Sequence, residues 1–414
     1  MTKITLKYGK GQFEVDIPEK NLTGIIKPNE LAGVPDEQAE IRRALDSPVG
    51  SRKLRDQVKA GMKVAVIISD VTRPVPSYKF LPTLLDEINA GGVPDKDITV
   101  VVALGSHRNT TEAEKEALAG EMAFGRVRVI DMDRNDCKTV GTSSFGHKID
   151  IYRGVVDADF VVCTGNIEYH YFAGYSGGPK AILPGCASHD TIQNNHAMMV
   201  SPKAESGRLD SPIRQEIDEL PSLMNVGFLC DVVLNSKKEI VAVMAGDPIK
   251  AHRKGVELVD RMYSIRVKPA DIVIVSAGGY PKDINMYQAQ KAMDNVKHVV
   301  KQGGIMIMLA ECDECLGNDV FACWVDEATT IQEQAERMDR KFELGGHKAS
   351  VIARTAMKCE ICLVSKIPDE KVRKMFLTPV KTPEEALALA FRKHGPDATV
   401  LVSPYGGMML SKTA

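Results

Sequence analysis

Short apolar runs alternate with amphipathic stretches along most of the chain. Such runs occupy residues 63–69, 98–105, 159–165 and 271–279, and they read KVAVIIS, ITVVVALG, DFVVCTG and DIVIVSAGG. Runs of this length, rich in Val and Ile, are typical of strands that are buried on both faces of a parallel sheet. Helical patterns separate them at residues 78–92, 111–120, 248–262 and 287–304. The pattern therefore predicts an α/β fold with mainly parallel sheets.

Two further features of the pattern indicate how the chain is organised. Residues 1–20 alternate apolar and polar positions like a hairpin, and residues 231–246 predict a second hairpin that turns at 236–238. The helical stretch at 248–262 and the polar segment RMYSIRVKP lead out of the first half of the chain. We expect two α/β domains, at residues 1–265 and 266–414, with the active site in the cleft between them.

Composition excludes several classes of protein. The 414 residues are 44% hydrophobic and 26% charged, and the formal net charge is only −2. A near-neutral chain without blocks of like charge does not suggest a nucleic acid or an anionic membrane as partner. No apolar run approaches membrane-spanning length, and the start lacks the apolar core of a signal peptide. Nine scattered cysteines are typical of reduced thiols, so we expect a cytoplasmic protein.

Two cysteine pairs have the spacing of zinc ligands. They are Cys312 with Cys315, and Cys359 with Cys362. The interval between the pairs is far longer than in a zinc ribbon, and the second pair lies in the strand-like run KCEICLVS. Packing in the core explains these sulfurs better than a metal does.

Polar residues follow the ends of four predicted strands. Ligands of open α/β sheets bind beyond the carboxyl ends of the strands, so these residues are candidates for one site. Each of them alone also has a structural explanation. Asp70 could cap a turn and pair with Arg73 on the surface, and His107 could stand at the entry of a helix. The candidates are Asp70, Arg73, His107, His170, His196, Tyr287, Gln288 and Lys291.

The stretch EYHYFAGYSGGPKAILPG, at 168–185, has the glycines and the lysine of a phosphate-binding loop. Its glycines allow close approach of a bulky anionic group. A Walker loop, however, needs Ser or Thr after the lysine, and here Pro179 precedes Lys180 and Ala181 follows it. Phosphoryl transfer is therefore disfavoured. Lys180 is a candidate for covalent attachment of a cofactor, and the alternative is an ordinary surface lysine after a flexible turn.

His196 follows the polar run QNN and precedes AMMV. Imidazole is a good ligand for nickel, zinc, copper or iron. No acidic cluster and no HExxH motif accompanies this histidine. If a metal binds here, most of its ligands must come from a source other than the protein.

Taken together, these motifs resemble the nickel-pincer lactate racemase family of 2-hydroxy-acid racemases and epimerases. The resemblance rests on TGNIEYHYFAGYSGGPKAILPG and NNHAMM, supported by SDVTRP, ALGSHR and YQAQK in the family's order. It implies that Lys180 carries pyridinium-3,5-bisthiocarboxylic acid mononucleotide, the nickel pincer nucleotide, and that His196 is the protein ligand of its nickel. Further cofactor-binding residues implied by the resemblance are Asp70, Gly174, Ser176, Gly177 and Gly178.

The resemblance also implies a reaction. A racemase of a 2-hydroxy acid, with lactate as the first expectation, would remove hydride from the carbinol carbon and return it to the other face. His107 and His170 would exchange the hydroxyl proton, because racemisation needs a base on each side. Arg73 and Lys291 would bind the substrate carboxylate, and Tyr287 and Gln288 would orient the substrate. The implied partners are proteins that synthesise and insert the cofactor, with the chain as a monomer or homodimer.

Other functions stay open at this stage. Malate, phenyllactate or an aldonate are alternative substrates, because the family resemblance implies a pocket tryptophan from the C-terminal domain and the chain has only Trp324. A pyridoxal-phosphate enzyme would also use a lysine, a phosphate cup and an arginine. A nucleotide-binding module without catalysis does not account for the histidines, and an NAD dehydrogenase lacks its GxGxxG motif.

Overall fold

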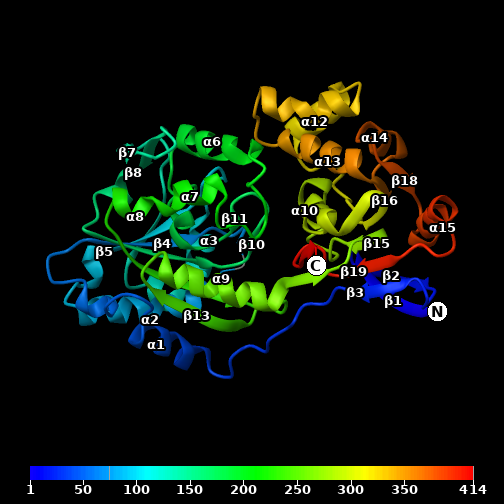
Figure 1. Cartoon of the computed structure of the whole chain (residues 1–414). Coiled ribbons are helices and arrows are strands. Elements are labelled where there is room, and N and C mark those ends of the chain that lie inside the picture. Colours follow the sequence, from blue (N-terminus) through cyan, green and yellow to red (C-terminus); the bar gives the residue numbers. More distant parts are fainter. Residues whose placement is uncertain (74, 414) are drawn as a thin grey trace. The chain divides into compact units, whose positions relative to one another are not determined.

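The structure, a computed structural model, describes residues 1–73 and 75–413. The chain forms two compact units, and their elements are labelled in Figure 1. Unit 1 comprises Met1–Asn29 and Tyr263–Ala414, and unit 2 comprises Glu30–Met262. Each unit is built around a six-stranded sheet.

The sheet of unit 2 has the strand order β13-β12-β9-β4-β5-β6. All neighbours are parallel except β12 and β13, which form an antiparallel hairpin. The central strands are almost completely inaccessible, which explains their continuously apolar sequences. The strands are β4 (Val64–Ser69), β5 (Ile98–Ala103), β6 (Arg128–Asp131), β9 (Phe160–Asn166), β12 (Val226–Leu234) and β13 (Ile240–Gly246).

Helices and short hairpins complete unit 2. The hairpins are β7 (Cys137–Thr142) with β8 (Lys148–Tyr152), and β10 (Tyr169–His170) with β11 (Gly174–Tyr175). The helices are α1 (Glu37–Asp46), α2 (Ser77–Ala90), α3 (Glu112–Ala119), α4 (Glu121–Phe124), α5 (Arg153–Val156), α6 (His189–Ala197), α7 (Pro212–Asp218), α8 (Leu220–Leu223) and α9 (Lys250–Tyr263), which ends in unit 1. Short 3-10 turns are η1 (Leu54–Asp56), η2 (Asp95–Asp97), η3 (Gly178–Ala181) and η4 (Met198–Val200).

The sheet of unit 1 is parallel throughout, in the order β18-β17-β16-β15-β19-β3. The hairpin of β1 (Thr2–Tyr8) and β2 (Gly11–Ile17) packs its apolar face on this sheet, where Leu6 and Val15 join the core. The strands are β3 (Leu22–Ile25), β15 (Ala270–Ser276), β16 (Val300–Leu309), β17 (Glu360–Val364), β18 (Thr378–Val380) and β19 (Val400–Ser403).

The remaining elements of unit 1 are a two-stranded parallel pair and a set of helices. The pair is β14 (Ser264–Val267) with β20 (Leu410–Thr413). The helices are α10 (Met286–Val296), η5 (Lys297–Val299), α11 (Asp319–Glu327), α12 (Ile331–Arg340), α13 (His347–Lys358), α14 (Asp369–Lys374) and α15 (Pro383–His394).

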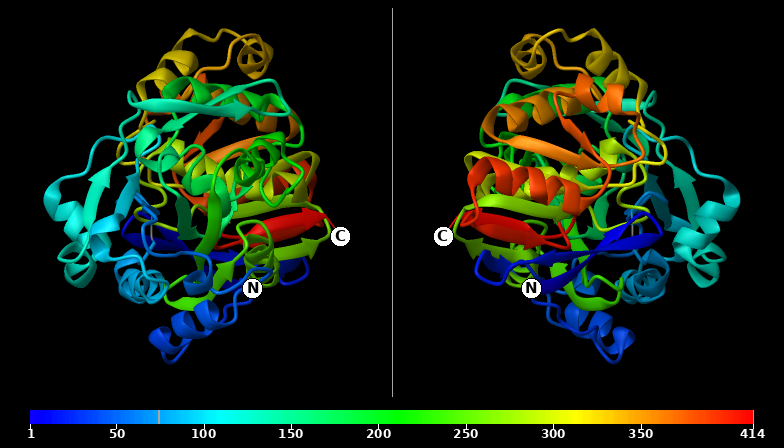
Figure 2. Two further views of the ribbon diagram at one scale, coloured as in Figure 1. Left: turned by 90° about the vertical axis from the view of Figure 1, so that its left-hand side faces the viewer. Right: turned by 90° about the vertical axis from the view of Figure 1, so that its right-hand side faces the viewer.

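The fold class predicted from the pattern is confirmed, and so are the two hairpins. The division of the chain differs at its start, because residues 1–29 join unit 1 rather than the predicted domain 1–265. Residues 1–29 belong to unit 1 because β3 pairs with β19 in its sheet. Both views of Figure 2 show the blue N-terminal strands beside the red C-terminal ones. The helix predicted at 287–304 ends at Val296, because Val300 already pairs with Ala270 in the sheet.

Among the described residues, no helix is both long enough and apolar enough to cross a bilayer.

Candidate active site

Two residues that follow neighbouring strands of unit 2 form a hydrogen-bonded pair. Asp70 comes directly after β4, and His107 lies in the turn after β5, the adjacent strand. Nδ1 of His107 is 2.5 Å from Oδ2 of Asp70. The side chain of Asp70 is only 3% exposed, whereas that of His107 is 39% exposed. A buried carboxylate therefore holds a ring that solvent or a ligand can reach.

Thr72 completes the support of this pair. Its Oγ1 donates to Oδ1 of Asp70 at 2.7 Å, and its backbone N–H donates to the same atom at 3.2 Å. Burial alone would favour the protonated acid, but the hydrogen bonds from His107 and Thr72 outweigh burial and lower the pKa of Asp70. An ionised carboxylate can only accept, so Nδ1 of His107 carries the hydrogen. In the neutral ring the lone pair then lies on Nε2, the arrangement of a general base held by a carboxylate.

Arg73 does not form the surface pair with Asp70 that the sequence allowed. Its backbone N–H donates to the carbonyl of Asp70 at 3.1 Å, and its side chain is exposed. Within residues 1–73 and 75–413, the guanidinium group makes no hydrogen bond and no ion pair. Arg73 is therefore available to bind an anion.

The glycine-rich loop follows β9 and starts with the short hairpin of β10 and β11. Ser176 closes this hairpin, because its Oγ donates to the carbonyl of Asn166 at 2.6 Å and accepts from the N–H of Glu168 at 2.9 Å. Gly177 has a φ of 74°, and a Cβ placed there would lie 2.5 Å from Oδ2 of Asp231. The loop thus needs glycine at this position for both its backbone conformation and its space. The chain then enters η3, which carries the half-buried Lys180.

His196 stands in the last turn of α6, half-buried, with a buried Nδ1 that makes no hydrogen bond to any described residue. Burial and the nearby charge of Lys180 lower its pKa to about 3, although the carbonyl of Ile192 acts in the opposite direction. The ring is therefore neutral at physiological pH. The influence of Lys180 on this pKa places the lysine and the histidine within electrostatic range of each other in unit 2.

His170 lies at the end of β10 and is linked to His196 through an aromatic side chain. The ring of Phe172 is 4.5 Å from that of His170 and 4.9 Å from that of His196, in edge-on geometry in both cases. The backbone N–H of Ala173 donates to Nδ1 of His170 at 3.3 Å.

The three predicted residues of unit 1 lie in the first turns of α10. Asn285 caps this helix, and Nζ of Lys291 donates to Oε1 of Gln288 at 2.8 Å. The ring of Tyr287 lies 5.2 Å from Nζ of Lys348, a fully buried lysine of α13 that belongs to no motif recognised in the sequence. Burial, with a smaller contribution from the charge of Lys291, strongly lowers the pKa of Lys348.

Trp324 is a core residue of unit 1 and is only 1% exposed. Its indole N–H donates to Glu343 at 3.2 Å, and the guanidinium carbon of Arg337 lies 4.5 Å from its ring. A Cβ at Gly346 would lie 2.3 Å from the same ring. The indole ring is therefore packed and hydrogen-bonded within unit 1.

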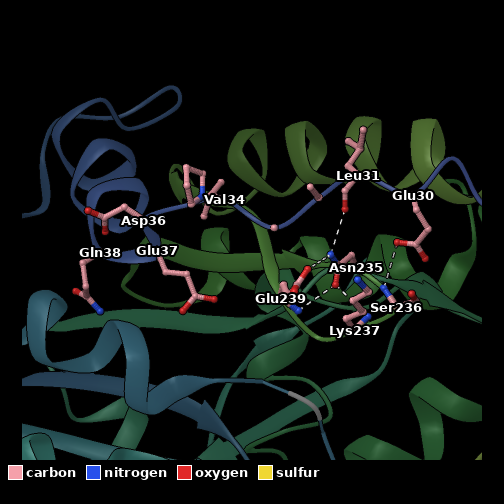
Figure 3. A pocket seen from close by; sticks show the side chains of 13 residues that line it. Glu30, Leu31, Val34, Asp36, Glu37, Gln38, Asn235, Ser236, Lys237 and Glu239 are labelled. Atoms are coloured by element: carbon pink, nitrogen blue, oxygen red, sulfur yellow. Dashed lines mark hydrogen bonds between the residues drawn. The ribbon is translucent and has the colours of Figure 1, made fainter.

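A large surface hollow of unit 2 contains none of the predicted residues. Residues 30–38 line it together with Asn235, Ser236, Lys237 and Glu239 of the β12–β13 turn (Figure 3). Its carboxylates have structural partners: Asp36 caps α1, Glu37 pairs with Lys79, and Glu239 accepts from Asn235 at 2.7 Å. These carboxylates are therefore engaged by groups of the protein itself.

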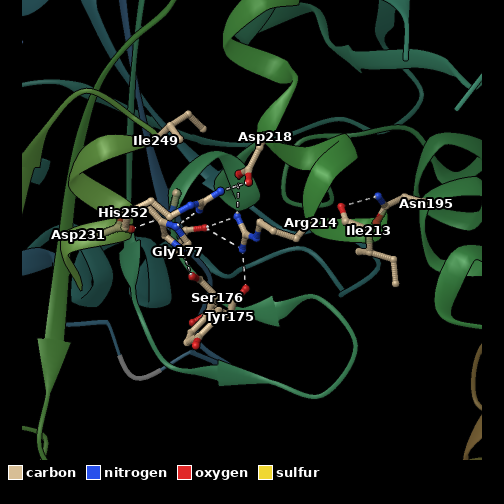
Figure 4. Close-up of polar contacts among 12 residues, drawn as sticks. Tyr175, Ser176, Gly177, Asn195, Ile213, Arg214, Asp218, Asp231, Ile249 and His252 are labelled. Atoms are coloured by element: carbon tan, nitrogen blue, oxygen red, sulfur yellow. Dashed lines mark hydrogen bonds and ion pairs between the residues drawn. The ribbon is translucent and has the colours of Figure 1, made fainter. Parts of the chain in front are cut away.

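Sequence reasoning missed a set of buried charged residues behind the glycine-rich loop (Figure 4). Arg214 of α7 and Asp231 of β12 are both 0% exposed. Oδ2 of Asp231 accepts from the N–H of Gly178 at 2.7 Å, and burial raises the pKa of this carboxyl to about 7. The charge in the middle of the apolar strand VGFLCDVVL was a signal that could have found Asp231. The sequence around Arg214 gave no comparable signal, because its helix has an ordinary mixture of polar and apolar residues.

These residues fit a lysine-tethered group that carries its own metal ligands. His196 offers a neutral imidazole within electrostatic range of Lys180, and imidazole is a suitable ligand for nickel. The protein does not offer a complete set of metal ligands, because the described part of the chain contains no group of three or more His, Cys, Asp or Glu arranged to hold a metal. A metal at His196 would need its other ligands from the bound group.

Comparisons with known proteins match most of the chain. The model of the lactate racemase N-terminal domain family matches residues 8–207, and that of the C-terminal domain family matches residues 265–410. The lactate racemase of Thermoanaerobacterium thermosaccharolyticum is 36% identical over 98% of both chains, and that of Lactiplantibacillus plantarum is 32% identical over 98% of this chain and 99% of its own.

Solved structures agree with this assignment. The lactate racemase apoprotein from T. thermosaccharolyticum superposes with a TM-score of 0.91 at 34% identity, covering 99% of this chain and 100% of that one. A crystal structure of a Thermotoga maritima protein, at 18% identity and a TM-score of 0.65, shares the fold over 93% of this chain and 100% of its own. With two domain models and two full-length relatives in agreement, the chain belongs to the lactate racemase family.

Proposed function

We propose that this protein is a racemase of a 2-hydroxy acid, with lactate as the first substrate to test, and that it uses a nickel pincer nucleotide attached to Lys180. Membership of the lactate racemase family supports the reaction class. The observation that carries the proposal is the arrangement in unit 2, where the Asp70–His107 pair accompanies a neutral His196 near Lys180.

The residues that would hold the cofactor are Lys180, as the covalent attachment point, and His196, as the nickel ligand. Gly174, Ser176, Gly177 and Gly178 would form the backbone around its phosphate. When bound, the cofactor supplies the acceptor and donor of the substrate hydride.

The acid–base work then falls to two histidines, His107 and His170. Nε2 of His107 accepts the hydroxyl proton of one enantiomer, and Asp70 stabilises the imidazolium that forms, in the manner of a catalytic carboxylate. His170, in its imidazolium form, donates a proton to the oxygen of the product and becomes the neutral ring. For the other enantiomer the two rings exchange these roles.

Two cationic side chains recognise the carboxylate of the substrate. Arg73 binds the substrate carboxylate in bidentate fashion and Lys291 adds a second positive charge, while Tyr287 and Gln288 orient the substrate. The exposed side chain of Arg73 supports its part in this. Trp324 is a core residue of unit 1, and malate, phenyllactate and aldonates belong in the substrate panel beside lactate.

The test uses protein produced together with cofactor-synthesis enzymes. We expect an adduct of mononucleotide mass that maps to Lys180, about one nickel per chain, and interconversion of lactate enantiomers in a chiral assay. Lys180→Ala should lose the adduct and the activity while keeping the fold. Lys203→Ala, which changes an exposed lysine of the same unit, should keep both. Activity and adduct that survive in Lys180→Ala would refute the proposal, as would a wild-type chain without adduct when a known relative is loaded in the same cells.

A further inference from the structure

We infer that helix α7, with its cap Ser211, is a positioning element that fixes three segments of the proposed site relative to one another; the inference rests on the proposed function. The side chains of Ser211, Arg214 and Glu216 are all 0% exposed, and each contacts a different segment. These segments are the turn that follows His170, the loop that leads to Lys180, and the helix that carries His196.

Ser211 fixes the first segment. Its Oγ donates to the carbonyl of Phe172 at 2.6 Å. Phe172 is the residue whose ring contacts both His170 and His196. The start of α7 is thus tied to the backbone of the turn between β10 and β11.

Arg214 fixes the second segment. Its Nη2 donates to the carbonyl of Tyr175 at 2.5 Å, and its Nη1 donates to the carbonyl of Gly177 at 3.3 Å (Figure 4). The carbonyl between them, that of Ser176, pairs with Nε2 of the buried His252 at 2.8 Å. Three consecutive carbonyls of the loop therefore have buried side-chain partners. Because these carbonyls are held from behind, the path of the backbone into η3 and Lys180 is fixed.

Glu216 fixes the third segment. Its Oε2 accepts from Nδ2 of Asn195 at 2.8 Å, one residue before His196. The other oxygen, Oε1, accepts from Oγ of Ser143 at 2.6 Å and lies 2.7 Å from Nδ1 of His147. A buried carboxylate with three partners holds the last turns of α6 in place.

Stability alone does not require buried charged side chains such as those of Arg214 and Glu216. A buried charge is costly to desolvate, and apolar side chains of similar volume often serve a core equally well. Here two buried charges on one seven-residue helix reach different segments of the same site. Catalytic groups require placement within about 0.5 Å, and buried hydrogen bonds to the supporting backbone supply it. This explains why α7 carries Arg214 and Glu216 on buried positions.

The test is hydrogen exchange, followed by mass spectrometry, on the cofactor-free chain. Arg214→Met removes the donors and keeps most of the volume; we expect exchange to accelerate about tenfold in residues 172–181, from the loss of buried hydrogen bonds, and to stay unchanged in 189–197. Glu216→Gln should show the reverse pattern. Arg214→Lys should restore part of the protection. Gln215→Ala, at an exposed position of the same helix, should alter neither segment.

A second readout uses the loaded enzyme. Glu216→Gln should lower kcat while KM stays within about twofold, and Arg214→Met should reduce the adduct at Lys180. Uniform acceleration of exchange across unit 2, or none in the expected segment, would overturn the inference. Should Arg214→Met fail to fold, Arg214→Lys and Glu216→Gln still decide between a positioning and a purely structural role. Hydrogen exchange is measured without cofactor, so its result does not depend on the proposed function. The proposed function fails separately, if the wild-type chain takes no adduct.

Discussion

Replacement of Asp70 by Asn tests the assignment of His107 as the proton acceptor. The two side chains have nearly the same shape, and Asp70 is only 3% exposed, so the change removes a charge without opening a cavity. An amide N–H can donate to Nδ1 of His107, whereas the carboxylate only accepts from it. The variant therefore loses the stabilisation of the imidazolium, and it favours the tautomer in which Nε2 carries the hydrogen and cannot act as a base.

The magnitude follows from the 2.5 Å contact between Nδ1 of His107 and Oδ2 of Asp70. A hydrogen bond to a charged group contributes about 1.5–3 kcal/mol, which corresponds to a loss of about 10- to 150-fold in rate. The wrong tautomer adds to this loss, up to the whole contribution of general base catalysis, about 10²- to 10⁴-fold. We therefore expect kcat to fall at least tenfold, with KM changed much less.

The assay measures both directions of racemisation by chiral chromatography, on protein whose adduct at Lys180 has been quantified by intact mass. Asp86→Asn is the matched control, because Asp86 is a 68% exposed partner of Arg126 in the same unit, and we expect its activity to stay at the wild-type value. The reasoning would be refuted by a fully loaded Asp70→Asn enzyme whose kcat lies within twofold of wild type.

Three further predictions concern the loop, a buried acid and the anion site. Gly177→Ala should destabilise the protein by about 1–3 kcal/mol in urea unfolding, because its φ of 74° and the 2.5 Å approach to Asp231 exclude a Cβ, and an unchanged midpoint would contradict this account. The pKa of Asp231 is raised to about 7, so between about pH 4 and pH 7 the folded state binds more protons than the unfolded state, and stability should fall as pH rises through this window. Asp231→Asn should flatten that slope, and an identical pH dependence in both proteins would rule out the assignment. Arg73→Lys should raise KM for lactate about tenfold with little change in kcat, through loss of bidentate binding; steady-state kinetics would count against this role if KM stayed constant.

Much of the fold could be predicted because the apolar pattern reports burial directly. Strands buried on both faces leave continuous apolar runs such as VAVIIS. Because residues that follow parallel strands lie at one edge of the sheet, Asp70 and His107 were expected to lie close together, and in the structure they form a hydrogen bond. The same reasoning misplaced the end of the helix at 287–304, since the local sequence does not reveal that Val300 pairs with Ala270.

By itself, the sequence determined the α/β class, the glycine-rich loop with Lys180, and the histidines that family resemblance singled out, because these depend on residue type and order along the chain. Only the tertiary structure assigned residues 1–29 to unit 1, since β3 pairs with β19 near the other end of the chain, where Oγ1 of Thr23 donates to the carbonyl of Val400, 377 positions away. It alone also revealed how Arg214, Glu216 and Asp231 support the site. The charges of Arg214 and Glu216 look like those of any surface helix until folding brings together the partners that bury them, which are distant in sequence. Asp231 stands out in its apolar strand, but only folding reveals that it accepts from the N–H of Gly178.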